Sequence, residues 1–333
     1  MQRIRAMTTG FRLSQAIHVV AALGVADLIE DEPVSAVDLA DQLRCDGDSL
    51  ARLMRALAAT DVFEEAEDGR FTHSPMSRLL RSDHPRSVRP MAVLIGQEHV
   101  WETWGTLMHS VRTGENAFVG RYGTDVWTYR NERPEQSAIF DAAMSANTAA
   151  LASEFGTTYD FTNAGTVVDL GGGDGTLLLG LLGSHTHLQG VLFDQPGVIA
   201  RARGVLARSP DTKAVERCRL VEGTIFGDHP EGGDLYVMRH ILHDWSDTDC
   251  VAILRCCREV LTGTGVLLVI ERVLEGPNEG VESKFSDLNM LVMPGGRERS
   301  EQQFAALFEE AGLRLTRRLP VVGGEWILEA ERA

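Results

Sequence analysis

Residues 166–176, with the sequence TVVDLGGGDGT, place the strongest constraint on how this chain can fold. The apolar residues after Thr166 are typical of a short buried strand. Glycines follow between residues 171 and 175, and an apolar run after them can form a helix. Glycine allows a tight turn and a close approach of the backbone to a ligand, because it has no Cβ. A strand, a glycine-rich turn and a helix are together typical of the nucleotide site in an open α/β sheet.

The spacing of these glycines indicates which nucleotide the turn binds. A dinucleotide site has the pattern G-x-G-x-x-G, but the last position of that pattern is Thr176 here, and no P-loop sequence occurs. Asp169 would repel a pyrophosphate and can accept a hydrogen bond from an ammonium group. Asp194, after the next predicted strand, can accept hydrogen bonds from both ribose hydroxyls. The pattern therefore favours S-adenosylmethionine over NAD and over a purely structural turn.

Length and charge exclude several other classes of protein. With 333 residues, the chain is long enough for roughly two domains. Its net charge of -16 argues against a nucleic-acid partner, which needs cations to neutralise phosphates, and against anionic membranes. We find no signal peptide and no apolar run near the roughly 18 residues of a membrane span, so we expect a cytoplasmic location. The cysteines form no C-x-x-C pair, which predicts reduced thiols in the core.

Residues 1–85 are predicted to form a winged-helix-like dimerisation domain. An apolar helical stripe runs through residues 11–30, a further helix is expected at residues 48–60, and a hairpin follows at residues 62–71. This order is typical of a winged helix, but the acidic residues around the helix at 48–60 argue against DNA binding. A small helical domain cannot bury the apolar stripe alone, so we predict a homodimer.

The rest of the chain is predicted to form two further parts. Residues 86–160 are mostly helical in pattern and are expected to link the domains and to line the substrate pocket. Over residues 161–333 strands alternate with helices, which predicts an α/β fold with a doubly wound, Rossmann-like sheet. Ligands of such a sheet bind at the carboxyl ends of its strands. The side chains expected there are those of Asp169, Asp194, Thr224, Ile225, Phe226, Arg239 and Glu271.

The sequence HILHDW at residues 240–245 carries the candidate general base. His243 comes just after a predicted strand end, where a loop can expose it, and histidine is the usual general base near neutral pH. The alternative is a histidine that only packs. His240, His243 and Asp244 together also suggest a metal site, but no further ligand cluster is present, so we expect no metal.

These motifs resemble those of the winged-helix small-molecule O-methyltransferases. This family contains plant phenylpropanoid and bacterial antibiotic-tailoring enzymes, and the resemblance is to its bacterial branch, with the mitomycin and carminomycin O-methyltransferases. It covers nearly the whole chain and rests on several motifs in the right order. They are LGVADLI, RTGENAF, VVDLGGGDG, FDQPGVI, HILHDWSD and GGRERSEQQF.

The resemblance implies roles for individual residues. His243 would take the proton from the acceptor hydroxyl, and Glu271 and Glu298 would flank and orient it. At two positions the chain departs from the family: Thr224 replaces an adenine-binding Asp and carries no charge, and Arg239 replaces a common Lys. The expected cofactor contacts are Asp169, Gly171, Gly173, Asp194, Thr224, Ile225, Phe226 and Arg239. The expected substrate contacts are Met144, Asp244, Trp245, Met290 and Met293, among which methionines adapt to flat apolar ligands.

The predicted function is methyl transfer from S-adenosylmethionine to a phenolic hydroxyl of a small aromatic natural product. Two alternatives stay open. A relative could keep the cofactor and change the chemistry to N-methylation, hydroxylation or decarboxylation, but the presence of His243, Glu271 and Glu298 counts against it. A winged-helix regulator could sense the cofactor, but the acidic charge counts against DNA binding. The sequence does not identify the acceptor.

Overall fold

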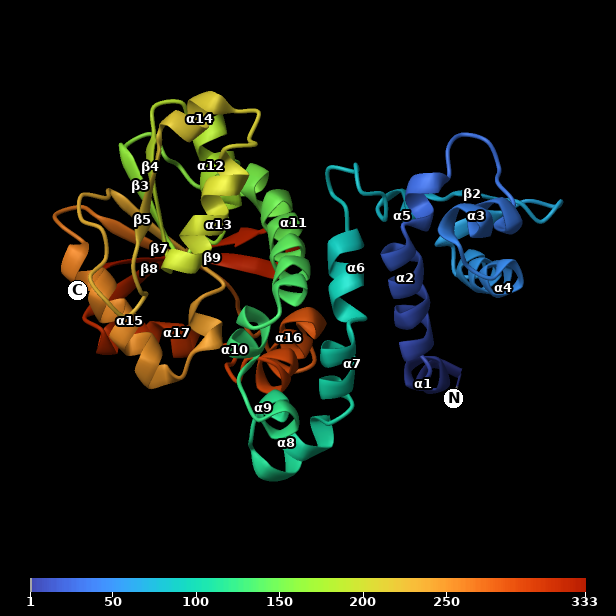
Figure 1. Ribbon diagram of the computed structural model, residues 1–333. Coiled ribbons are helices and arrows are strands. Elements are labelled where there is room, and N and C mark those ends of the chain that lie inside the picture. The colour runs from blue at the N-terminus through green and yellow to red at the C-terminus, as the bar shows by residue number, and fades with distance from the viewer. Residues whose placement is uncertain (1) are drawn as a thin grey trace. The chain divides into compact units, whose positions relative to one another are not determined.

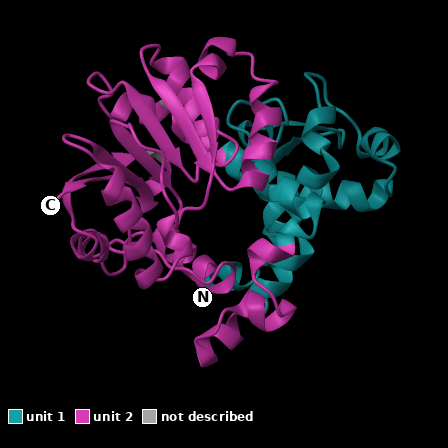
Figure 2. Ribbon diagram, turned by 60° about the vertical axis from the view of Figure 1, so that its left-hand side comes forward, with its two compact units in different colours: residues 1–105, 130–146 teal, residues 106–129, 147–333 magenta. Residues whose placement is uncertain are grey.

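The structure is a computed structural model that describes residues 2–333. The chain forms two compact units, which Figure 2 shows in different colours. Unit 1 consists of residues 1–105 and 130–146, and unit 2 consists of residues 106–129 and 147–333. Because both units are assembled from two stretches of chain, they do not test the predicted domain borders at residues 85 and 160, which stay predictions.

Unit 1 begins with the predicted order of helices and hairpin. Ser35 and Asp46 cap two of its helices by accepting hydrogen bonds from backbone N–H groups three residues on. The core is made of apolar side chains from all of these elements, among them Val20, Leu39 and Phe63. The elements are α1 (Gln2–Thr8), α2 (Phe11–Leu23), η1 (Val25–Leu28), α3 (Ala36–Leu43), α4 (Gly47–Ala58), β1 (Phe63–Glu65), β2 (Phe71–His73) and α5 (Pro75–Arg78).

Short helices follow, and one long helix leads to the sheet. In unit 1, α2 packs against α6, where the His18 ring lies so close to Gly96 that a Cβ there would be 1.9 Å from it. The helices are α6 (Arg89–Ile95), α7 (Glu98–Trp104), α8 (Leu107–Thr113), α9 (Ala117–Tyr122), α10 (Val126–Asn131) and α11 (Pro134–Thr158). None of the helices within residues 2–333 is both long and apolar enough to cross a membrane.

Unit 2 is built on a seven-stranded sheet in the order β5-β4-β3-β6-β7-β9-β8 (Figure 1). The neighbouring strands β5, β4, β3, β6 and β7 run parallel. Strands β9 and β8 add an antiparallel pair at the edge next to β7. The predicted doubly wound sheet with a closing strand pair is therefore confirmed. The strands are β3 (Thr166–Leu170), β4 (Gln189–Asp194), β5 (Cys218–Glu222), β6 (Leu235–Arg239), β7 (Val266–Arg272), β8 (Leu313–Val321) and β9 (Glu325–Arg332).

Both faces of this sheet are covered by helices. Successive strand residues point to opposite faces, and both sets are apolar here, so each face needs a covering layer. Val168 and Met238 pack on the face covered by α15 (Asp247–Val260) and α17 (Glu301–Glu310). Their neighbours Val167 and Val237 pack on the face covered by the end of α11 and by the next three helices. Those are α12 (Thr176–Ser184), α13 (Pro196–Leu206) and α14 (Thr212–Glu216); α16 (Val281–Val292) follows β7.

Candidate active site at the ends of the parallel strands

The glycine-rich turn between β3 and α12 has no room for a side chain at Gly171 or Gly172. Gly171, Gly173 and Gly175 adopt positive φ angles of 72°, 62° and 84°, which favour glycine. A Cβ at Gly171 would lie 2.5 Å from a methyl carbon of Ile241, and one at Gly172 would lie 2.5 Å from Asp169 Oδ2. The turn thus exposes bare backbone at the strand ends, as the sequence predicts.

Two carboxylates stand beside this turn. Asp169 is buried, and its Oδ2 atom has no hydrogen-bond partner among the described residues. Burial raises the pKa of Asp169 to about 7, and the charge of Asp194 adds to this effect. Asp194 accepts a hydrogen bond from Gly173 N at 2.9 Å and another from Gln195 N at 2.7 Å. A buried carboxylate without a partner suits a cationic ligand group.

The loop after β5 meets the loop after β6. The ring of Phe226, which is 39% exposed, lies edge-on against Trp245 with the ring centroids 4.8 Å apart. Thr224 Oγ1 accepts from Phe226 N at 3.4 Å, and His229 Nε2 donates to the carbonyl of Ile225 at 2.9 Å. Two residues predicted to contact cofactor and substrate, Phe226 and Trp245, therefore form one aromatic wall.

Arg239, at the end of β6, is engaged in an ion pair. Its guanidinium donates to both carboxylate oxygens of Glu325, at 2.8 and 3.0 Å, and to Thr148 Oγ1 at 2.8 Å. Sequence reasoning did not single out Glu325 or Thr148. A cofactor contact by Arg239 stays a prediction.

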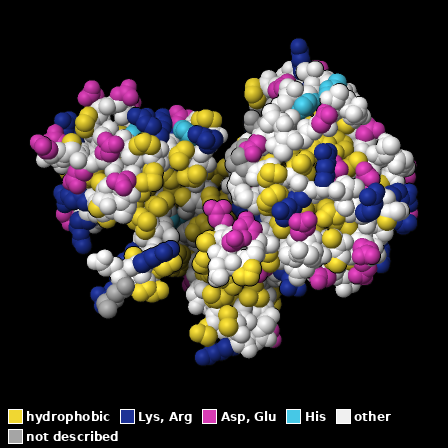
Figure 3. All heavy atoms as spheres, turned by 180° about the vertical axis from the view of Figure 1, so that it is seen from behind, with side chains coloured by type: hydrophobic (Ala, Val, Ile, Leu, Met, Phe, Trp, Pro, Cys, Tyr) yellow, Lys and Arg dark blue, Asp and Glu magenta, His cyan; other side chains and the backbone are white. Residues whose placement is uncertain are grey.

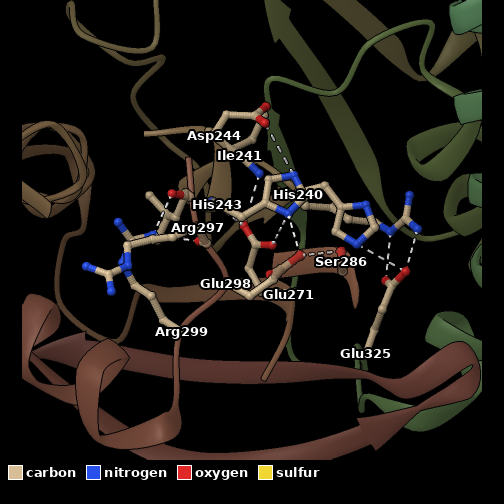
Figure 4. Close-up of polar contacts among 12 residues, drawn as sticks. His240, Ile241, His243, Asp244, Glu271, Ser286, Arg297, Glu298, Arg299 and Glu325 are labelled. Atoms are coloured by element: carbon tan, nitrogen blue, oxygen red, sulfur yellow. Dashed lines mark hydrogen bonds and ion pairs between the residues drawn. The ribbon is translucent and has the colours of Figure 1, made fainter. Parts of the chain in front are cut away.

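The structure brings the three predicted catalytic residues together (Figure 4). His243 lies on a short 3-10 helix (Leu242–Asp244) after β6 and is 7% exposed. Its Nδ1 atom is 3.2 Å from Glu298 Oε1 and 3.4 Å from Glu271 Oε2. Its Nε2 atom is 3.6 Å from Asp244 Oδ1. Glu271 comes from β7 and Glu298 from the loop before α17, and both are fully buried.

The two glutamates are themselves held in place. Glu271 Oε1 accepts hydrogen bonds from Ile241 N at 3.1 Å and His243 N at 3.3 Å. Glu298 Oε1 accepts from Ser286 Oγ at 2.7 Å, and Glu298 N donates to Asp287 Oδ1 at 2.9 Å. Each acid therefore contacts Nδ1 of His243 from a position that the backbone or α16 determines.

A buried arginine holds the loop that carries His243. Arg299 is fully buried and donates to the carbonyls of Leu242, at 2.8 Å, and Trp245, at 2.7 Å, and to Asp247 at 2.8 Å. Sequence reasoning missed Arg299, although its place beside Glu298 in GGRERS was the available signal. The Leu242 carbonyl also accepts from Trp245 N at 3.3 Å, so Arg299 adds a second donor there and ties both ends of the short 3-10 helix together.

The acids change the proton affinity of His243. Burial lowers its pKa, but the carboxylates of Glu271, Asp244 and Glu298 outweigh this effect and raise it to about 10. Burial raises the pKa of Glu271. Burial also acts to raise the pKa of Glu298, but the hydrogen bonds from His243 and Ser286 and the charge of His243 together outweigh it and lower that pKa. The arrangement can therefore hold a proton at Nδ1 and accept another at Nε2.

The predicted substrate residues fall in both units. Trp245 and Asp244 are half-buried beside His243, and Met290 and Met293 are buried in and just after α16. The loop after Met293 packs on the His243 loop, since a Cβ at Gly296 would lie 1.9 Å from the His243 carbonyl oxygen. Met144 is half-buried on the part of α11 that belongs to unit 1, so the structure does not join it to the other four.

His243, Glu271 and Glu298 also form a group that could hold a metal ion, with ligand atoms within 4.8 Å of one another. The hydrogen bond between His243 Nδ1 and Glu298 explains the closeness of these side chains without a metal ion. The expectation that the site uses no metal stays a prediction.

Comparison with known proteins places this geometry in a family context. Residues 104–314 match the O-methyltransferase domain, and residues 6–83 match the O-methyltransferase dimerisation domain. The phenazine O-methyltransferase of Lysobacter antibioticus is 39% identical over 97% of this chain and 94% of its own. The mitomycin biosynthesis 6-O-methyltransferase of Streptomyces lavendulae is 37% identical over 96% of this chain and 91% of its own. The crystal structure of LaPhzM matches with a TM-score of 0.93 at 37% identity, over 100% of this chain and 99% of that one.

Proposed function

The chain belongs to the S-adenosylmethionine-dependent O-methyltransferases, and we propose that its acceptor is a phenolic hydroxyl of a small aromatic natural product. Membership confirms the predicted fold class, enzyme class and cofactor. The observation that supports a hydroxyl acceptor is the placement of His243 between Glu271 and Glu298, beside the glycine-rich turn. Such a base is needed to deprotonate an alcohol or phenol.

The residues around the glycine-rich turn fit S-adenosylmethionine. The unpartnered oxygen of Asp169 would take a cationic group of the cofactor, and Asp194 would accept hydrogen bonds from its ribose. At Gly173 no atom of the described residues other than its chain neighbours lies within 4 Å of the place that a Cβ would take, so the backbone there is open to a ligand. When bound, the cofactor supplies an electrophilic methyl group on a sulfonium. We infer that Thr224, Ile225 and Phe226 border the adenine.

We infer that His243 takes the acceptor proton at Nε2. A phenol pKa of about 10 and an ordinary histidine pKa of about 6.5 make this transfer uphill by about 5 kcal/mol. Because the nearby acids raise the pKa of His243 to about 10, they remove most of this cost. His243 must carry a proton at Nδ1 alone before its Nε2 atom can accept this one.

Glu271 and Glu298 have a separate part in this proposal. Their carboxylates face Nδ1, so a proton on Nδ1 is held between them and Nε2 keeps its lone pair. They also stabilise the imidazolium that forms after the transfer. Trp245, Asp244, Met290 and Met293 would border the acceptor, with Met144 as a further candidate from unit 1.

The acceptors of the relatives indicate which compounds best test the proposed hydroxyl acceptor. One relative, from Streptomyces cremeus, is a 3-amino-4-hydroxybenzoate 4-O-methyltransferase, and another, from Streptomyces carzinostaticus, methylates 2,7-dihydroxy-5-methyl-1-naphthoate. However, an 8-amino-8-demethylriboflavin N,N-dimethyltransferase is 35% identical to this chain, so N-methylation is the second candidate. The geometry at His243 favours oxygen, because a neutral amine needs no base before it attacks.

The experiment incubates the protein and S-adenosylmethionine with a panel of hydroxylated benzoates, naphthoates, phenazines and quinones. We expect mass spectrometry to show a gain of one methyl group on at least one acceptor. 3-Amino-4-hydroxybenzoate is the most informative probe, because it offers an amine and a hydroxyl on one ring. NMR of any product should place the methyl on oxygen. Methylation only of nitrogen, or of no member of the panel, would contradict the proposal.

We further propose that the protein acts as a cytoplasmic homodimer without a nucleic-acid or membrane partner. Support comes from the dimerisation domain at residues 6–83 and from the net charge of -16. The apolar side chains that unit 1 leaves exposed are considered below.

A further inference from the structure

We propose that His240 is a positioning residue that fixes the plane of the His243 ring. The inference rests on the proposed function, in which Nε2 of His243 faces the acceptor. It concerns a residue that contacts the base and is not needed to accept the proton itself.

The contacts of Nδ1 with the two glutamates do not by themselves fix the orientation of the His243 ring. Glu298 makes the one hydrogen bond there, at 3.2 Å, and Glu271 Oε2 makes only an ion-pair contact at 3.4 Å, so both contacts end on the same ring atom. A ring held at one atom can still tilt about that contact. A contact on the ring face is needed to remove this freedom, and His240 supplies it. The two imidazoles are stacked, with centroids 5.0 Å apart and planes inclined by 22° (Figure 4).

The His240 ring can act as a support because it is itself held. Its Nε2 atom lies 3.1 Å from Glu325 Oε1, at the start of β9. Both oxygens of Glu325 also receive the guanidinium of Arg239, which donates in addition to Thr148 on α11. The support therefore extends from α11 and β9, through Arg239 and Glu325, to the ring that faces the base.

The charge state of His240 suits this role. Burial lowers its pKa to about 4, although Glu325 acts in the opposite direction. His240 is therefore neutral, with Arg239 supplying the positive charge that balances Glu325. A neutral ring face can lie against His243 in both of its protonation states, whereas a second imidazolium would repel the imidazolium that forms during proton transfer.

The backbone at His240 is also unusual. Its φ angle of 53° lies in the left-handed region, which is uncommon for residues other than glycine, although asparagine, aspartate and histidine adopt it more often than the rest. His240 N nevertheless donates to the Ile270 carbonyl at 3.1 Å, and the next residue, Ile241, donates to Glu271. This turn leaves β6 so that the side chains of residues 240 and 243 lie side by side. Strained backbone of this kind persists where surrounding structure enforces it, and it is common at functional sites.

Two variants separate ring support from simple packing. His240→Asn suits a left-handed backbone but has no ring, and His240→Phe keeps a ring face and loses the contact with Glu325. Protein labelled with ¹³C at histidine Cε1 is studied by NMR with S-adenosylhomocysteine bound, and the His243 signal is assigned by its loss in His243→Gln. We expect one narrow His243 signal in wild type and in His240→Phe, and a broadened or doubled signal in His240→Asn.

Calorimetry with S-adenosylmethionine provides the control for folding, and we expect affinities within about twofold of wild type for both variants, since His240 faces the base. A narrow single His243 signal in His240→Asn would overturn the proposal. If His240→Asn does not bind the cofactor, His240→Gly replaces it, because glycine also suits the left-handed backbone and also lacks a ring. Broadening in His240→Gly supports the proposal and an unchanged signal refutes it. Failure of the proposed function is seen separately, as normal methyl transfer by His243→Gln.

Discussion

At the scale of single residues, the chemistry depends on how buried carboxylates act on one imidazole. Glu271 and Glu298 are both fully buried, and each has one oxygen, Oε2, that makes no hydrogen bond among the described residues. Burial raises the pKa of Glu271, and the charge of Glu298 adds to this effect, because two buried carboxylates at one site resist ionising together. At Glu298 the hydrogen bonds from His243 and Ser286 and the charge of His243 together outweigh burial, so its pKa is lowered. A proton on Nδ1 lies close to both carboxylates and reduces the repulsion between them.

His243→Gln should lower the rate of methyl transfer by about 10²–10⁴-fold, the usual range for the loss of a general base. Glutamine keeps the size and hydrogen-bonding capacity of the side chain but cannot take a proton near neutral pH. Affinity for S-adenosylmethionine should barely change, because the imidazole faces the acceptor. Glu271→Gln should cost less, since it leaves the base in place. Single-turnover rates on the acceptor found by the panel are the measurement.

A more acidic phenol provides the control for this prediction. Such an acceptor needs less help to lose its proton, so the difference between wild type and His243→Gln should shrink as the acceptor becomes more acidic. Near-normal turnover of His243→Gln on an ordinary phenol would show that positioning alone drives the reaction, and the assignment of the base would be wrong.

Asp169 should make cofactor affinity depend on pH. Its folded pKa of about 7 lies above the ordinary value of 3.8, so the free protein holds this carboxyl largely protonated below pH 7. A cationic ligand group prefers the ionised form, and affinity for S-adenosylmethionine should therefore fall as the pH drops through 7. Asp169→Asn removes this titration and is the control for ionisation of the cofactor itself. The ratio of wild-type to variant affinity should rise by up to about tenfold between pH 6 and pH 8.

The same residue predicts an effect on stability with the opposite sign. An acid whose pKa is raised on folding ionises first in the unfolded chain, so the ligand-free protein loses stability as the pH rises from about 4 to 7. Asp169→Asn should therefore be more stable than wild type at pH 8, and the difference should be smaller at pH 4. Thermal unfolding at both pH values measures it. Equal stability and a constant affinity ratio would mean that Asp169 is paired or solvated.

At the scale of elements, those site residues could be predicted from the sequence whose position depends on a local sequence pattern. The turn at Gly171 is predictable because its positive φ angle and its close neighbours require glycine. Asp169, Asp194 and Glu271 are predictable because the carboxyl ends of parallel strands meet at one edge of the sheet. Glu298 lies in a loop, and only the family resemblance pointed to it.

Residues that depend on long-range strand order were not predictable in this way. Glu325 meets Arg239 and His240 because β9 inserts antiparallel beside β7, where Glu325 is in register with Arg272. No local pattern specifies that insertion. Arg299 was missed for another reason, since a charged residue in a polar loop is usually exposed. Here the carbonyl groups of the His243 loop pair with it, so burial is tolerated.

At the scale of the whole molecule, the apolar helix predicted at residues 11–30 divides between two environments. Val20 and Ala21 of α2 are buried in the core of unit 1 at 1% exposure each. Phe11, Val19 and Leu23 of the same helix remain 53%, 38% and 36% exposed. In α1, Ile4 and Met7 are more exposed still, at 61% and 66%. Figure 3 shows hydrophobic side chains gathered on the surface of this part of the chain.

A helix that is apolar on its outer as well as its inner face is stable in water only when a partner covers it. The dimerisation domain matched at residues 6–83 contains most of these side chains, so a second copy of the chain is the expected partner.

Sedimentation velocity at micromolar concentration should show a dimer. The double variant Phe11→Glu and Leu23→Glu should shift it toward monomer, because it places charges in the apolar contact. Val281→Glu on α16, where the side chain is 68% exposed and lies outside the matched domain, is the matched control and should sediment as wild type does. A wild-type monomer, or a dimer that the double variant leaves intact, would show that these helices do not form the interface.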